Sequence, residues 1–104
     1  MIIILGSVRT DAGNRDAIEA ESIAHCVRSR AEPGCIAHNC HFDAEDPDRL
    51  VFVEKWANAE ALQAHFAVPA SHDFVATLRA LAKEPPVMEI FGADAVDLAA
   101  LTKR

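Results

Sequence analysis

Apolar residues are gathered in short runs that predict four β-strands. Residues 2–9 and 49–56 are rich in β-branched and other apolar side chains, which is typical of buried strands. A more polar run over 35–43 is joined to the second of these by about five turn residues, so the two predict a hairpin. A last apolar run, 87–93, follows the helix-breaking pair Pro85-Pro86.

The segment between the first two strands predicts an amphipathic helix, for which Asp11 or Asn14 is a suitable N-cap. Its apolar positions recur at steps of three and four, as expected for a stripe that faces a core, and they are Ala17, Ala20, Ile23, Ala24, Val27 and Ala31. His25 falls on the other side, with Glu21 and Arg28, so we expect that side to be solvated.

A second helical region lies between the third and fourth strands. Asn58 is a good N-cap for a short helix over 59–66. Pro69 interrupts this region and suits the first turn of a new helix. The apolar stripe of that helix consists of Phe74, Val75, Leu78, Leu81 and Ala82. A final helical turn is expected within 94–101.

The resulting order, β-α-β-β-α-β, predicts an α+β fold of the ferredoxin-like type, with a four-stranded antiparallel sheet and helices on one face. The strands are apolar on both sets of alternate positions, since Ile2 and Ile4 alternate with Ile3 and Leu5. A sheet with one solvated face should instead alternate apolar with polar residues. We therefore expect a homodimer in which a partner sheet covers the second face.

Size and charge narrow the class of protein. The chain has 104 residues, which fits one domain over 1–104, with a core over about 2–93 and a C-terminal tail over 94–104. The formal net charge of −6 makes a nucleic-acid partner unexpected, because phosphate backbones are themselves negative. The apolar start, residues 1–5, is too short for a signal peptide or a membrane span, so no membrane association is expected.

The cysteines indicate a reducing compartment. Cys26, Cys35 and Cys40 are odd in number and form no Cys-x-x-Cys pair, so we expect free thiols and a cytoplasmic location.

Several short motifs together resemble the antibiotic biosynthesis monooxygenase (ABM) family. The run from Glu54 to Phe74 contains Glu54-Lys55-Trp56, the capped Glu-Ala-Leu helix with its Ala64-His65 pair, and Ser71-His72. The helix exit Glu32-Pro33-Gly34 adds to this pattern, and the resemblance covers roughly residues 2–92. It implies a dimeric α+β barrel with a pocket between sheet and helices. Several members of the family oxidise phenols, quinols or polyketide intermediates with O2 and without a metal or organic cofactor.

Two departures from the family pattern affect the chemistry. His38 stands where many members carry a Tyr, and this chain contains no Tyr at all. The haem-degrading branch carries an Asn in the first strand and a second Trp, which are replaced here by Gly6 and His65. At the position where that branch ligates iron the chain has Thr77 or Leu78, so haem degradation is not expected.

The candidate catalytic residues are histidines, because imidazole is the side chain best suited to proton transfer near neutral pH. His65, His72 and His38 are the candidates, and the expected substrate-binding residues are Trp56, Phe52, Glu54, Phe66 and Phe74. His41 points away from His38, because side chains on a strand alternate between faces. The two histidines therefore cannot hold one metal within the strand, and we expect no metal site. The family resemblance, together with the absence of a G-x-G-x-x-G or P-loop motif, implies that no cofactor is used.

Three functions are open at this point. The first is a cofactor-independent monooxygenase acting with O2 on a small aromatic, quinol-type or polyketide-like substrate. The second is an isomerase or decarboxylase of a small metabolite in the same pocket, with Arg9 or Lys55 receiving an anionic group. The third is a non-enzymatic dimer that binds a small molecule.

Overall fold

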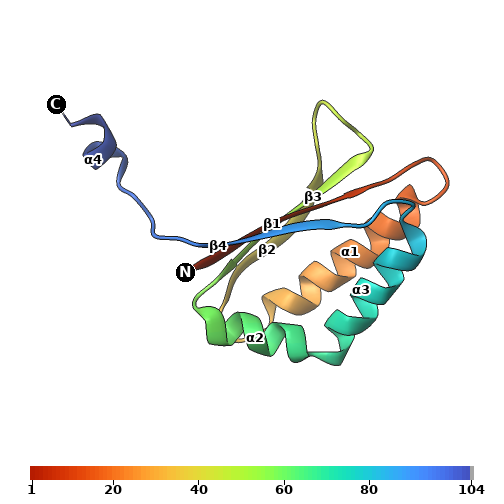
Figure 1. Cartoon of the computed structure of the whole chain (residues 1–104), viewed down its shortest axis with the longest axis horizontal. Coiled ribbons are helices and arrows are strands. Elements are labelled where there is room, and N and C mark those ends of the chain that lie inside the picture. Colours follow the sequence, from red (N-terminus) through yellow and green to blue (C-terminus); the bar gives the residue numbers. More distant parts are fainter. Residues whose placement is uncertain (104) are drawn as a thin grey trace.

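The computed structural model describes residues 1–103 and has one antiparallel sheet with three helices packed against one face (Figure 1). A short fourth helix stands away from the sheet at the end of an extended segment (Figure 1). The elements are β1 (Ile2–Arg9), α1 (Arg15–Arg30), β2 (Cys35–Phe42), β3 (Arg49–Trp56), α2 (Ala59–Ala67), α3 (Pro69–Leu81), β4 (Val87–Gly92) and α4 (Leu98–Thr102). The expected domain, 1–104, is thus described except for residue 104, which lies outside the described residues.

The strands lie in the order β2-β3-β1-β4, and each pairs antiparallel with its neighbours. This is the ferredoxin-like arrangement that the sequence predicts, and every predicted strand agrees with the observed one to within one residue at either end. Residues that pair across the sheet point to the same face, so Ile4, Glu54 and Ile90 share the face toward the helices.

The core lies between this inner face and helices α1 and α3. Val8 of β1, Leu50 and Phe52 of β3, and Phe74 and Leu78 of α3 are all at least nine-tenths buried and form one cluster. Burying a side chain of this size contributes about 1.5–3 kcal/mol relative to leaving it exposed. A second cluster of Ile4, Trp56 and Leu62 lies under α2.

Helix α1 buries a different face from the one its apolar stripe predicts. Ile23 and Val27 are half exposed, at 49% and 54%, whereas His25 and Cys26 are buried. The full buried face is Ile18, Ser22, His25, Cys26 and Ser29. The expectation that His25 is solvated is therefore wrong. Small residues let the helix pack close to the sheet, and the Ser29 hydroxyl donates to the carbonyl of His25 within the helix at 2.7 Å.

The local signals around α2 and α3 are confirmed. The Asn58 side chain accepts a hydrogen bond from the backbone N–H of Ala61 at 2.9 Å and so caps α2. Pro69 begins α3, where its missing N–H costs nothing. Gly34, between α1 and β2, has φ +82° and lies so close to α2 that an added Cβ would stand 2.4 Å from the Cβ of Ala61.

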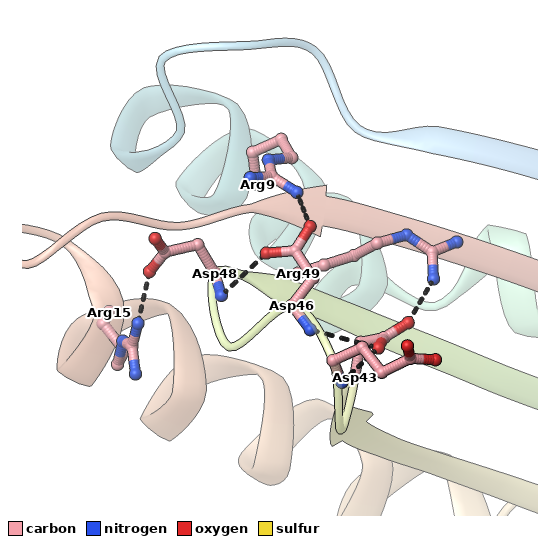
Figure 2. Close-up of polar contacts among 7 residues, drawn as sticks. Arg9, Arg15, Asp43, Asp46, Asp48 and Arg49 are labelled. Atoms are coloured by element: carbon pink, nitrogen blue, oxygen red, sulfur yellow. Dashed lines mark hydrogen bonds and ion pairs between the residues drawn. The ribbon is translucent and has the colours of Figure 1, made fainter.

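The loop of the β2–β3 hairpin is held by three arginine–aspartate pairs (Figure 2). Arg9 pairs with Asp46 and Arg15 with Asp48, while Arg49 approaches Asp43 at 3.3 Å. The side chains of Asp43 and Asp46 also accept backbone N–H groups inside the loop, so this acidic turn is ordered by its own side chains.

The sheet face opposite the helices is uncovered in the single chain. It carries apolar residues from three strands, namely Ile3, Leu5, Val51, Val53, Val87 and Phe91, which we call the outer apolar face. Leu5, Val87 and Phe91 are 42%, 59% and 44% exposed. Among residues 1–103, none of the helices is long and apolar enough to cross a membrane.

Candidate functional site

A cavity of about 970 Å³ lies between the inner face of the sheet and the helices. Its walls come from β1, β3 and α3, and from the segment that leads into β4, and they are mostly apolar. Such a volume accommodates a small organic molecule of one to a few rings. We call this space the main cavity.

Three buried histidines meet in the wall of the main cavity, and we call them the histidine cluster. His25 comes from α1, His38 from β2 and His65 from α2, with exposures of 6%, 0% and 4%. The ring centroids of His25 and His38 are 5.0 Å apart, and that of His65 lies 5.4 and 5.6 Å from them. One ring nitrogen of each residue lies within 4.8 Å of a ring nitrogen of the other two.

His65 is held by a carboxylate. Its Nδ1 lies 2.8 Å from Oε1 of Glu32, in the turn that follows α1. An Nδ1–H donated to a carboxylate fixes the imidazole tautomer and leaves the Nε2 lone pair free. Trp56 packs beside the same ring at a centroid distance of 4.5 Å, so His65 is fixed both by a hydrogen bond and by packing.

His38 is fully buried between a thiol and a carboxylate. Its Nδ1 lies 3.2 Å from Sγ of Cys26. Its Nε2 lies 3.2 Å from Oε1 of Glu54, but the angles are not those of a hydrogen bond. Within the described chain, 1–103, this nitrogen therefore has no hydrogen-bond partner. A buried polar atom without a partner is costly, and such atoms are common where a ligand binds.

His25 is neutral at physiological pH. Burial lowers the pKa of its imidazole to about 3, and the neighbouring His38 and His65 rings act in the same direction. The ring stacks on Phe74, with centroids 4.0 Å apart and planes 5° from parallel. A neutral imidazole keeps one nitrogen lone pair, which can accept a proton or bind a metal.

Glu54 remains ionised although it is only 8% exposed. Burial, the largest single effect, raises the pKa of this carboxyl, but interactions with His38 and the hydrogen bond from Trp56 outweigh it and hold the pKa below its usual value. The Trp56 indole N–H donates to Oε1 of Glu54 at 3.0 Å. A carboxylate thus stands beside the histidine cluster and balances charge there.

Most of the residues that the sequence suggests for the site line the main cavity. They are His38, His65, His72, Phe52, Glu54, Phe66 and Phe74. Trp56 is not a cavity wall as expected, because it is fully buried behind Glu54 and His65. His72 is exposed in the first turn of α3, on the cavity wall but outside the histidine cluster.

The cationic residues of the cavity differ from those expected. Arg9 pairs with Asp46 in the hairpin loop, and Lys55 points to the outer sheet face with Ile3. Neither lines the cavity, where Arg79 and Lys83 are found instead. They come from α3 and the segment after it, which sequence reasoning left out.

Cys26, the thiol beside His38, stays protonated. A hydrogen-bonding interaction with Cys40, reinforced by burial, raises the pKa of Cys26 far above its usual range, so this thiol stays protonated. All three cysteines are free, as expected.

Comparison with known proteins decides the family. A sequence model of the family described as antibiotic biosynthesis monooxygenase matches residues 1–77. The chain belongs to the ABM family. An ABM-type protein from Deinococcus radiodurans, itself a candidate monooxygenase, superposes with a TM-score of 0.89 at 21% identity, covering 94% of this chain and 98% of that one. Rv0793 from Mycobacterium tuberculosis superposes with a TM-score of 0.84 at 21% identity, covering 91% and 96%.

Two further relatives have a higher sequence identity to this chain. A protein of unknown function from Bacteroides thetaiotaomicron, described as a candidate oxidoreductase, is 28% identical and has a TM-score of 0.81, covering 86% of this ABM chain and 94% of that one. The uncharacterized protein sll1783 from Synechocystis sp. is 30% identical over 90 residues, or 86% of this chain. The chain spans 61% of the length of that relative.

Proposed function

We propose that this ABM-family chain is an oxidoreductase that oxidises a small aromatic, quinol-type or polyketide-like substrate with O2 in the main cavity. The observation that carries the proposal is the meeting of an apolar space of about 970 Å³ with the buried His65, whose ring is held by Glu32. Electron-rich phenols reduce O2 once they are deprotonated, so the protein needs to supply a cavity that excludes water and a base.

His65 is the proposed base. Glu32 holds the Nδ1 proton, which leaves the Nε2 lone pair to accept the proton of a substrate hydroxyl or activated methylene. The resulting imidazolium is stabilised by Glu32 at 2.8 Å. His72 and His38, the other sequence candidates, are less suited: His72 is exposed, and His38 has a fully buried ring.

The proposed reaction balances without a cofactor. Loss of a proton from a methylene between aromatic rings to His65 gives a carbanion, which passes its electrons to O2 and forms a carbon–oxygen bond. The peroxide that results loses water and becomes a ketone. In sum the CH2 group and O2 give a C=O group and H2O, and the proton held by His65 leaves with the water.

An oxygen electrode tests this function directly. Hydroquinones, catechols and anthrone-type phenols are supplied to metal-stripped protein, and products are analysed after reaction under labelled O2. The proposal requires uptake above the rate without enzyme, with label in the product of a methylene substrate. The absence of uptake with every substrate would favour the isomerase, decarboxylase or binding function instead.

We also propose that the chain works as a homodimer in the cytoplasm. The outer apolar face supports the dimer, because Leu5, Val87 and Phe91 are each more than 40% exposed on the uncovered side of the sheet. Three free thiols support a reducing compartment.

A further inference from the structure

We propose that His25, His38 and His65 together bind one divalent transition-metal ion of the zinc type. These histidines come from three elements that are far apart in the sequence, namely α1, β2 and α2. Their imidazole rings meet at the same buried point. Imidazole suits Zn²⁺, Co²⁺, Ni²⁺ and Cu²⁺, whereas Mg²⁺ and Ca²⁺ need oxygen ligands. Three histidines with a fourth position open are a recurrent arrangement for a zinc-type ion.

The partners of two rings orient their free nitrogens. Nδ1 of His65 is held by Glu32 at 2.8 Å, and Nδ1 of His38 lies 3.2 Å from Sγ of Cys26. When each Nδ1–H donates to its partner, the Nε2 lone pair of each ring is left for a ligand. Metal-binding histidines commonly donate the N–H of their other ring nitrogen in this way, often to a carboxylate.

His38 gives independent evidence of a ligand site. Its Nε2 is fully buried and has no hydrogen-bond partner in the described part of the chain, residues 1–103. A metal ion would satisfy this atom.

The separation of the nitrogens fits a site that closes slightly around its ion. A tetrahedral zinc ion with Zn–N bonds of about 2.0–2.1 Å places its nitrogens about 3.4 Å apart. One ring nitrogen of each histidine lies within 4.8 Å of one nitrogen of each of the other two, so small rotations of the rings bring three nitrogens into range. Glu54, with Oε1 3.2 Å from His38 Nε2, supplies negative charge beside the ion.

The fourth position of the ion faces the main cavity, which all three histidines line. A bound metal therefore meets any molecule in the cavity. It also takes the Nε2 lone pair that the proposed function assigns to His65, so metal binding and proton transfer by His65 exclude each other. The metal site does not rest on the proposed function, because binding is measured without substrate.

Cobalt binding tests the site. The full chain is stripped with a chelator and titrated with Co²⁺, whose visible absorption reports nitrogen coordination, and then with Zn²⁺ in competition. We expect one Co²⁺ per chain. The His25→Phe variant, whose ring can still stack on Phe74, should bind Co²⁺ more than about 100-fold more weakly, and Glu32→Gln about 10–100-fold more weakly. His41→Gln, on the exposed side of β2, is the control and should bind like the parent chain.

The measurements distinguish a variant that fails to fold from one that folds but does not bind metal. Thermal melting without metal identifies any variant that fails to fold, and Glu32→Gln, altered at a residue 18% exposed, then carries the test. Parent-like binding by His25→Phe and Glu32→Gln would overturn the site, as would loss of binding in His41→Gln. No Co²⁺ or Zn²⁺ bound by the parent chain at micromolar concentration would also overturn it.

Discussion

Glu32 and His65 lie 33 residues apart in the chain and meet with Oε1 2.8 Å from Nδ1. The contact joins the turn after α1 to the last turn of α2 and leaves Nε2 as the ring nitrogen of His65 that Glu32 does not hold. Both proposals made for this protein depend on that nitrogen, as a base in one and as a metal ligand in the other.

Replacing Glu32 by Gln should slow the proposed oxidation while leaving the fold intact. The amide keeps the shape of the side chain but cannot stabilise the imidazolium. We therefore expect kcat to fall about tenfold or more, which is part of the roughly 10²–10⁴-fold that general acid–base catalysis contributes. Glu21→Gln, on the exposed side of α1, is the matched control and should keep the parent rate. Equal rates for all three proteins would show that Glu32 has no part in the reaction.

Zinc should inhibit the oxidation reversibly. An ion held by the histidine cluster occupies His65 Nε2, and Zn²⁺ itself carries no redox chemistry. We expect oxygen uptake to fall as Zn²⁺ is added and to return with a chelator. The His25→Phe protein should need at least about tenfold more Zn²⁺ for half-inhibition, relative to its own rate without metal. Stimulation by Zn²⁺, or identical inhibition of both proteins, would contradict this.

The glycine after α1 should be required for stability. Gly34→Ala forces a side chain into φ +82° and against the Cβ of Ala61, which should lower the free energy of unfolding by at least about 2 kcal/mol. Gly92→Ala in β4 meets no atom within 4 Å and serves as the control, with a change below about 1 kcal/mol. Urea denaturation measures both, and a Gly34→Ala loss no larger than that of the control would refute the expectation.

The outer apolar face should hold two chains together. Light scattering at micromolar concentration should give twice the mass of one chain for the parent protein and a single-chain mass for Leu5→Glu, since a buried unpaired carboxylate disfavours the interface. Ile23→Glu, on an exposed apolar position of α1, should remain dimeric. A parent protein that is monomeric under these conditions would disprove the dimer.

The fold could be predicted from sequence because its signals are local. The apolar runs of β1 and β3, the cap at Asn58 and the proline at position 69 each act over a few residues, and all are found where expected. The histidine cluster could not be predicted in the same way. His25 lies outside the alanine-rich stripe of α1, and only the close packing of small side chains against the sheet shows that it is buried.

Trp56 illustrates the same limit. Its position at the end of β3 was correctly predicted, but whether an aromatic residue forms a cavity wall or lies behind one depends on its tertiary contacts. Here the ring packs against His65 and its N–H donates a hydrogen bond to Glu54. Trp56 therefore positions two residues of the site without lining the cavity.

Oxygen uptake by metal-stripped parent protein and its His65→Gln variant, with anthrone-type phenols as substrates, tests the central claim most directly. We expect the parent protein to catalyse oxygen uptake, and we expect the rate to be at least about 100-fold lower in the variant, because His65 accepts the substrate proton. Uptake that is unchanged in His65→Gln, or that appears in the parent protein only after metal is restored, would contradict it.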